Sequence, residues 1–135
     1  MVQQRSFYMR TIEDVRKKHH VKKVQNAAES RSYVIGKDGL GFSLNHTKIV
    51  KGRKLYVQHS QHHEALYVTK GKGWIELVDC KEDLGRGKRF DLTPGTVYVI
   101  GEEESHWLGS DPNQDVHVVS VSAPQFTLCY QMPFI

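Results

Sequence analysis

Three histidines and one carboxylate lie within six residues of this chain, at His59, His62, His63 and Glu64. They stand between two short apolar runs, and a turn with two glycines follows at residues 71–73. This pattern predicts a strand, a polar corner, a second strand and a tight turn. Imidazole and carboxylate groups together are ligands that suit first-row divalent metals.

A second stretch repeats the order of a turn followed by a strand. Residues 92–100 contain a proline-glycine turn and then an apolar run that includes Tyr98. His106 follows an acidic run at residues 102–104. Two strand-turn-strand units that carry histidine, glutamate and tyrosine predict a small β-barrel with a metal ion in its mouth.

The elements that must position these side chains are short strands. Thr11 and Asp14 match the start signal of a helix, which we expect to continue to His19 or His20 on the outside of the barrel. Many short strands after one helix predict an all-β fold, an antiparallel β-barrel or jelly roll, as a single domain over residues 1–135. We expect loops at residues 26–30 and 79–88, and strands at residues 31–35, 40–50, 55–58, 66–69, 74–78, 89–92, 96–100, 106–108 and 116–122.

Length and composition limit the class of protein. A chain of 135 residues with 39% hydrophobic residues suits one domain with one core. No apolar run approaches the ~20 residues that span a membrane. Residues 1–5 lack the apolar segment of a signal peptide, so we expect a cytosolic protein without a membrane partner. Cys80 and Cys129 stand far apart, which favours two free thiols.

The charges are distributed unevenly along the chain. Residues 1–54 hold 13 Lys and Arg against 4 Asp and Glu, and residues 55–135 hold 6 against 11, which together give the net charge of +4. The basic residues form short clusters without the interleaved aromatic residues of a base-stacking surface. We therefore expect solvated faces and no nucleic-acid partner. A nucleic-acid-binding barrel is a weaker alternative, which a steep salt dependence of binding would reveal.

Glu64 and the following glycines, with the later Pro94-Gly95 turn, fit the cupin pattern. Tyr56 and Gln58 occupy its usual histidine positions, and Tyr98 occupies the position of its later histidine. These departures match one branch of the cupins. The chain resembles the ectoine synthase family over roughly residues 7–124, through the segments at residues 9–13, 41–43, 62–67, 71–73 and 94–99.

The resemblance implies a cupin-type barrel, a head-to-tail homodimer and a mononuclear iron(II) held by Glu64, Tyr98 and His106. Carboxylate, phenolate and imidazole together also suit zinc or manganese, with open positions for substrate or water. Such a metal would act as a Lewis acid. Tyr98 is a metal ligand, a general acid/base or a core residue, and His62 and His59 are proton shuttles or residues of a solvent-facing corner.

The resemblance weakens toward the substrate. A tryptophan and an arginine of the family, used around the substrate carboxylate, fall on Ala28 and Ser32. The acidic, histidine-bearing tail of the family is not visible in residues 125–135. The family's metal-ligand positions are therefore retained, and several of its substrate-binding positions are replaced. Aromatic residues on strands also fit core packing, but our candidate substrate-binding residues are Thr47, Phe42, Ser30, Ser120, Ser122 and Trp107, of which Thr47, Ser120 and Ser122 fall on pocket positions of the family.

Two functions follow from these observations. The first is a metal-dependent cupin lyase that closes a ring by loss of water in a small N-acyl diamino acid or a related substrate. Isomerisation or elimination at the same metal remains an alternative chemistry. The second is a non-catalytic cupin that binds or senses a small molecule, which Tyr56 and Gln58 favour because they reduce the ligand set of an ordinary cupin.

Overall fold

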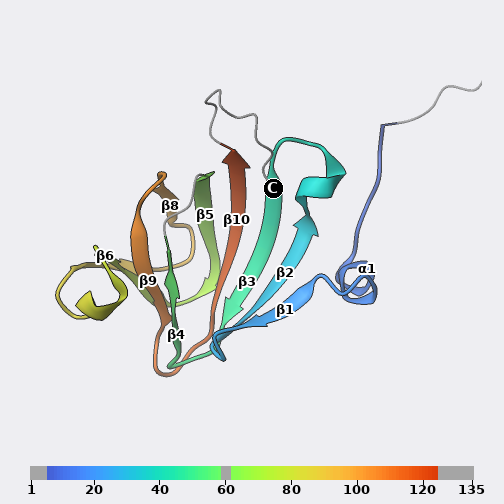
Figure 1. Cartoon of the computed structure of the whole chain (residues 1–135). Coiled ribbons are helices and arrows are strands. Elements are labelled where there is room, and N and C mark those ends of the chain that lie inside the picture. Colours follow the sequence, from blue (N-terminus) through green and yellow to red (C-terminus); the bar gives the residue numbers. More distant parts are fainter. Residues whose placement is uncertain (1–5, 59–61, 125–135) are drawn as a thin grey trace, which may run out of the picture.

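The structure, a computed structural model, describes residues 6–58 and 62–124. Its strands form two antiparallel sheets that face each other as a barrel (Figure 1). The six-stranded sheet has the order β1 (Val21–Val24), β2 (Ala28–Val34), β3 (Ser43–Ile49), β10 (Val116–Pro124), β5 (His62–Gly71) and β8 (Val97–Ile100). The four-stranded sheet has the order β4 (Lys54–Val57), β9 (Ser105–Ser110), β6 (Gly73–Val78) and β7 (Lys88–Leu92). The predicted all-β barrel is confirmed.

Helix α1 (Ile12–Lys17) precedes the sheets and lies outside them, beside β1 and β2 (Figure 1). The Thr11 side chain accepts a hydrogen bond from the backbone N–H of Asp14, and the Asp14 carboxylate accepts one from the N–H of Thr11. The predicted start is confirmed. The helix ends earlier than expected because His19 has a φ of 62°, in the left-handed region. Two short 3₁₀ helices, η1 (Gly36–Asp38) and η2 (Lys81–Asp83), complete the elements.

One hydrophobic core joins the two sheets. Ile49, Leu66 and Val118 come from the six-stranded sheet, and they share a buried cluster with Ile75 and Leu108 of the four-stranded sheet. We call the face of the six-stranded sheet that carries these residues its inner face, and the opposite side its outer face. Because side chains alternate along a strand, the core residues fix which positions point inward.

The turn between β5 and β6 depends on glycine. Gly71 has a φ of 82°, and a Cβ built there would lie 1.8 Å from the carbonyl oxygen of Asp115. A side chain at residue 71 would therefore collide with the backbone before β10. The predicted tight turn at residues 71–73 is confirmed.

The sequence-based prediction also places the starts of two strands wrongly. Residues 28–30 are the start of β2 and not a loop, so Ser30 is a strand residue. The strand β5 begins at His62 and not at Leu66, so Glu64 belongs to a strand and not to a corner. Pairing decides both places: residues 28–30 pair with β1 and β3, and the start of β5 pairs with the distant strand β10. Local composition does not report such pairing.

A second buried carboxylate stabilises the four-stranded sheet. Glu76 on β6 is 1% exposed and accepts hydrogen bonds from the N–H groups of Gly85 (2.6 Å) and Gly87 (2.8 Å) and from Arg89 (2.9 Å). Burial opposes its charge, but these donors outweigh burial and lower the pKa of Glu76. Glu76 thus fixes the loop between β6 and β7 and is fully engaged there.

Candidate metal and substrate site

Strand pairing places most of the predicted site residues on the inner face. Ser122 lies opposite Glu64 in the β10–β5 ladder, and Leu66 lies opposite Tyr98 in the β5–β8 ladder. Leu66 is a core residue, so Glu64, two positions earlier on β5, shares its face. Glu64 and Tyr98 are therefore diagonal neighbours on the inner face.

His106 reaches the same region from the facing sheet. It lies on β9 two residues before the core residue Leu108, so both side chains point between the sheets. The rings of Tyr98 and His106 meet edge to face, with 6.2 Å between their centroids. The negative charge of Glu64 acts on Tyr98 as well. The fold thus gathers one carboxylate, one phenol and one imidazole from β5, β8 and β9.

His106 is buried, and Glu64 and Tyr98 are half-buried beside it. The Tyr98 hydroxyl and both ring nitrogens of His106 are buried and have no hydrogen-bond partner among the described residues. Burial raises the pKa of the Tyr98 phenol, and the Glu64 charge adds to this effect. Burial also lowers the pKa of His106 to about 4. Native proteins seldom bury polar atoms without partners, so these atoms are candidates to bind a ligand or a metal ion.

The carboxyl group of Glu64 has polar support on one side. Its pKa is raised by burial, and hydrogen bonds from Ser122 and Ser120 partly oppose this. The Ser122 hydroxyl donates to Glu64 Oε2 over 3.3 Å. Two of the predicted substrate residues therefore contact the predicted metal ligand directly.

The donor set fits a metal ion. One carboxylate oxygen, one buried phenol oxygen and one imidazole nitrogen are the groups that Fe(II), Zn or Mn accept as ligands. Within residues 6–58 and 62–124 no three His, Cys, Asp or Glu side chains gather into a possible metal site. Among the described residues, the three donors that lie together here include the tyrosine.

Hydroxyl and amide groups occupy several other inner-face positions of β2, β3 and β10. Ser30 pairs with Thr47 and Thr47 with the core residue Val118, so all three share the inner face. The next row along the same strands holds Ser32, Asn45 and Ser120. Thr47, Ser30, Ser120 and Ser122 thus lie on one surface with Glu64 and Tyr98.

Sequence reasoning missed Asn45 and Ser32 as inner-face residues. Both lie two positions from residues that we had chosen, Thr47 and Ser30. Period-2 alternation along the strand expected at residues 40–50 would have found Asn45. Ser32 had been considered as a lost arginine position and not as part of the surface.

Other predicted residues lie elsewhere. Trp107 points away from His106: its indole N–H donates to the carbonyl of Lys81 (3.1 Å), and its ring packs on Tyr56. Phe42 stands just before β3 and is 38% exposed. His62 begins β5 on the face of Glu64, and His59 lies outside the described residues.

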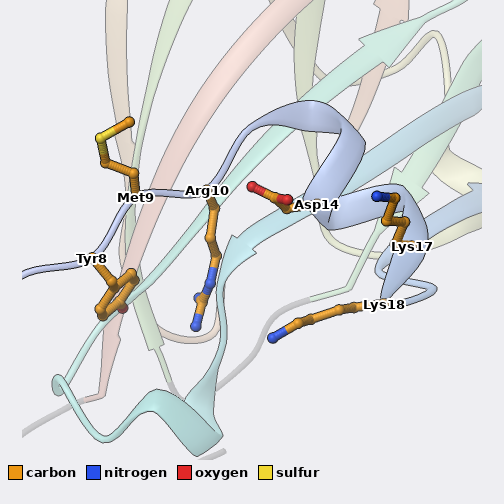
Figure 2. A pocket seen from close by; sticks show the side chains of 6 residues that line it. All are labelled: Tyr8, Met9, Arg10, Asp14, Lys17 and Lys18. Carbon is orange, nitrogen blue, oxygen red and sulfur yellow. The ribbon is translucent and has the colours of Figure 1, made fainter.

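Two histidines, His46 and His117, contact each other on the outer face. His46 and His117 lie 3.0 Å apart between ring nitrogens, and Arg31 lies 3.2 Å from His46. A separate groove of about 360 Å³ lies beside α1, lined by Tyr8, Met9, Arg10, Asp14, Lys17 and Lys18 (Figure 2). Arg10 in this groove is bound to both carboxylate oxygens of Asp38, at 2.7 and 2.8 Å. Neither cluster includes a residue of the predicted metal site.

The sequence as a whole was compared with known proteins. The profile of the family described as ectoine synthase matches residues 7–128. The chain belongs to the ectoine synthase family. L-Ectoine synthase of Bordetella avium is 36% identical over 100 residues, which cover 73% of this chain and 69% of that protein. The L-ectoine synthase of Oceanobacillus iheyensis is 39% identical over 80 residues, 59% of this chain and 58% of that protein.

Solved structures agree with this family. The crystal structure of ectoine synthase from P. lautus has a TM-score of 0.73 and 29% identity, and the match covers 90% of this chain and 80% of that one. A cupin-like protein from Thermotoga maritima, 20% identical with a TM-score of 0.63 over 76% of this chain and 75% of that one, shows the shared fold. The predicted resemblance and the interpretation as an ectoine synthase-like cupin enzyme are confirmed. No described helix is long and apolar enough to cross a membrane.

The buried His106 makes the stability of the metal-free protein depend on pH. The pKa of His106 is about 4 in the folded protein, below the ordinary value of 6.5. Between these two pH values the unfolded chain binds a proton at His106 and the folded chain does not. The stabilisation is therefore complete above pH 6.5 and is lost as the pH falls toward 4, by up to about 3 kcal/mol.

Glu64 has the opposite effect on the pH dependence of stability: because its pKa is raised, its contribution is lost as the pH rises through that pKa. The prediction is therefore tested as a difference between urea unfolding of the wild type and of His106→Gln at pH 7 and pH 4.5. The wild type should lose more free energy of unfolding than the variant. Equal losses would contradict the assignment of a buried neutral imidazole.

Proposed function

We propose that this chain is a cyclodehydratase of the ectoine synthase type, which closes a ring in a small N-acyl diamino acid or a closely related molecule. The free amine of the substrate attacks the acyl carbon of the same molecule. A C–N bond forms, the acyl oxygen leaves as water with two protons from the attacking nitrogen, and a cyclic amidine remains. The proposal rests on the clustering of Glu64, Tyr98 and His106. The Tyr98 hydroxyl and both His106 ring nitrogens there are buried without a described hydrogen-bond partner.

The proposed cofactor is one metal ion, iron(II) first, with zinc or manganese as alternatives. Glu64, Tyr98 and His106 would hold it. When bound, such an ion supplies Lewis-acid chemistry and polarises the acyl oxygen. His106 suits this role because it is neutral at physiological pH, and a neutral imidazole is the form that binds metals.

The surrounding residues orient the substrate and exclude water. Leu66 and Leu108 form apolar walls between the sheets, and loss of water is favoured where bulk water is kept out. Ser120 and Ser122 orient the Glu64 carboxylate. Tyr98 and His62 share the inner face with Glu64 and are the candidates for moving protons to and from the acyl oxygen and the amine.

The test is turnover by the full-length protein. Anaerobically purified protein, loaded with iron(II), is given N-acetyl-2,4-diaminobutyrate, and the cyclic product is followed by NMR. Product formation that depends on added metal supports the proposal. If the protein binds metal and substrate but forms no product, the non-catalytic sensor is favoured. If it binds neither metal nor substrate, both the enzyme and the sensor hypotheses fail.

We also propose a cytosolic enzyme that forms a homodimer. The exposed free thiol of Cys80 suits a reducing compartment. For the dimer, the outer face near β8, at the edge of its sheet, is apolar and exposed: Tyr67 is 49%, Val97 57%, Val99 68% and Val121 39% exposed. Self-association would cover this apolar surface.

The dimer has a direct test at the centre of the patch. Val99→Lys should convert a dimer into a chain of 15.5 kDa in analytical ultracentrifugation, because a charge in an apolar interface is costly to bury. Thr69→Lys, an exposed outer position on β5 away from β8, serves as a control and should leave the dimer intact. A wild type that sediments as a monomer at micromolar concentration would contradict the proposal.

A further inference from the structure

The outer face of the six-stranded sheet carries a chain of hydrogen bonds that the proposed reaction does not use. Arg31 Nη1 lies 3.2 Å from His46 Nδ1, and His46 Nε2 lies 3.0 Å from His117 Nδ1. A guanidinium group has no acceptor, so His46 Nδ1 accepts, and the proton of a neutral His46 is on Nε2. His46 therefore donates to His117 Nδ1, and the proton of a neutral His117 is on Nε2. The chain ends in an N–H donor at that nitrogen.

Both imidazoles are held in the neutral form. An added proton on His46 Nδ1 would face the Arg31 guanidinium, and one on His117 Nδ1 would face the N–H of His46. Burial, followed by the Arg31 charge, lowers the pKa of His46. Burial, followed by the charges of Lys70 and Lys48, lowers the pKa of His117. The pair therefore lies in an excess of positive charge, which an anion would relieve.

Two lysines flank His117 on the neighbouring strands. Lys48 of β3 and Lys70 of β5 each lie directly opposite His117 in the two ladders of β10. His117 stands between the buried residues Val116 and Val118, so it points to the outer face. Residues that pair across strands share a face, and a bulge beside His117 brings Lys70 into this pairing. Three nitrogen donors thus lie in one row across β3, β10 and β5, which are neighbours in Figure 1.

The acids that act on these histidines have other partners. Glu29 accepts a hydrogen bond from Arg31 over 2.9 Å. Asp115 accepts one from a backbone N–H in the turn after β3, over 2.8 Å. None of the ion pairs among the described residues involves Lys48 or Lys70. Their ammonium groups are therefore available to a ligand.

One N–H donor between two ammonium groups suits an anion with several oxygen atoms. Neighbouring strands lie about 4.8 Å apart, and a lysine ammonium on its flexible four-carbon stem reaches over the adjacent strand. Both ammonium groups can thus meet an oxyanion that is bonded to His117 Nε2. Phosphate and sulfate have enough oxygen atoms to accept from all three donors, and such charge-assisted hydrogen bonds are the strong ones. A metal cation does not suit the same row, because its charges are positive.

We propose that His117, Lys48 and Lys70 form a binding site for a tetrahedral oxyanion, which is either a free phosphate or the phosphoryl group of a phosphomonoester. Arg31 and His46 are positioning residues, which fix the tautomer of His117 through the chain of hydrogen bonds. The site lies on the opposite face of the sheet from the proposed metal site. It goes beyond the proposed function and does not depend on it.

The first experiment is a calorimetric titration of the full-length protein with inorganic phosphate at pH 7.5 and low ionic strength. The wild type should bind phosphate saturably. Lys70→Ala should weaken binding about tenfold, as expected for the loss of one charge-assisted hydrogen bond, and Lys70→Arg should keep most of the affinity. Because Lys70 is exposed, neither change disturbs the core.

Lys23→Ala is the matched control, since it removes the same charge from the same face on β1, three strands from β10. It should change phosphate affinity by less than about twofold. Equal weakening in Lys70→Ala and Lys23→Ala would assign the binding to overall charge and overturn the site, as would the absence of saturable binding in the wild type. AMP identifies the source: tighter binding than inorganic phosphate indicates a phosphomonoester, and equal or weaker binding indicates the free oxyanion.

Nitrogen NMR of the histidine rings tests the chain of hydrogen bonds separately. In the wild type, neutral His117 should carry its proton on Nε2, and this resonance should shift when phosphate binds. His46→Leu removes the donor to Nδ1 and should introduce the other tautomer of His117, a change that a loss of packing alone would not cause. A wild-type proton on Nδ1 would overturn the site, and an unchanged tautomer in His46→Leu would overturn the positioning role of His46.

Discussion

Glu64→Ala and His106→Ala are each expected to lose the bound metal and to lower turnover by more than roughly 100-fold. Removing a side chain that only supports a metal ligand typically costs about 10- to 100-fold in activity, and removing the ligand itself costs more. Each variant deletes one of the three donors, and no described cluster of His, Cys, Asp or Glu near them offers a replacement. The His106 side chain is 1% exposed, so solvent does not reach its position without opening the barrel.

The measurement is metal content by elemental analysis after anaerobic purification and reconstitution, together with the turnover assay. His63→Ala is the control, because His63 neighbours Glu64 on β5 but is exposed on the outer face. It should bind about one metal per chain, like the wild type. Full metal content in both the Glu64 and His106 variants would contradict the site, as would a wild type that takes up no metal.

The folding of these alanine variants is a separate question that the same preparations answer. His106 makes no described hydrogen bond, so its removal breaks no polar contact, although it leaves a cavity. His106→Gln keeps most of the volume and should fold like the wild type while it still fails to bind metal tightly. Loss of metal in this variant with an unchanged unfolding transition would separate ligation from stability.

Much of the fold could be predicted because it follows from local signals. Thr11 and Asp14 begin a helix through their own hydrogen bonds, and Gly71 is required by a turn geometry that other residues cannot adopt. A run of β-branched and aromatic residues such as residues 96–100 favours a strand directly. Each of these signals lies within a few residues of the element that it specifies.

The strand β1 could not be predicted in this way. Lys22 and Lys23 look like a solvated basic cluster, and no alternation marks Val21–Val24 as a strand. It exists because its backbone pairs with β2 and because Val24 completes the core. Charged residues on an edge strand also prevent pairing with other chains. The pairing of β1 with β2 was therefore out of reach of the local sequence.

The candidate site shows the same division. Residue types and the family resemblance selected Glu64, Tyr98 and His106, and the structure places these three together. Trp107 was chosen as an aromatic residue beside His106, but adjacent strand residues point to opposite faces, so it packs on Tyr56. The choice of face depends on which neighbours are buried, and that is a property of the whole barrel.

Tyr98→Phe is expected to lower kcat by about 100-fold or more while it leaves the metal-free protein as stable as the wild type, or more stable by about 1 kcal/mol. The phenol oxygen is buried without a described hydrogen-bond partner. Removing it therefore relieves a desolvation cost and breaks no bond, and the ring still packs opposite Leu66. A group that costs stability and is needed for activity is typical of a functional site.

The variant also separates the roles left open for Tyr98. If the phenol is a ligand, metal affinity and kcat fall together; if it is a general acid or base, metal content stays near one per chain while kcat falls. Tyr67→Phe is the control, because Tyr67 lies on the outer face of the adjacent strand and is 49% exposed. A kcat within about twofold of the wild type in Tyr98→Phe would assign Tyr98 to the core. The metal site would then rest on Glu64 and His106 alone among the described residues.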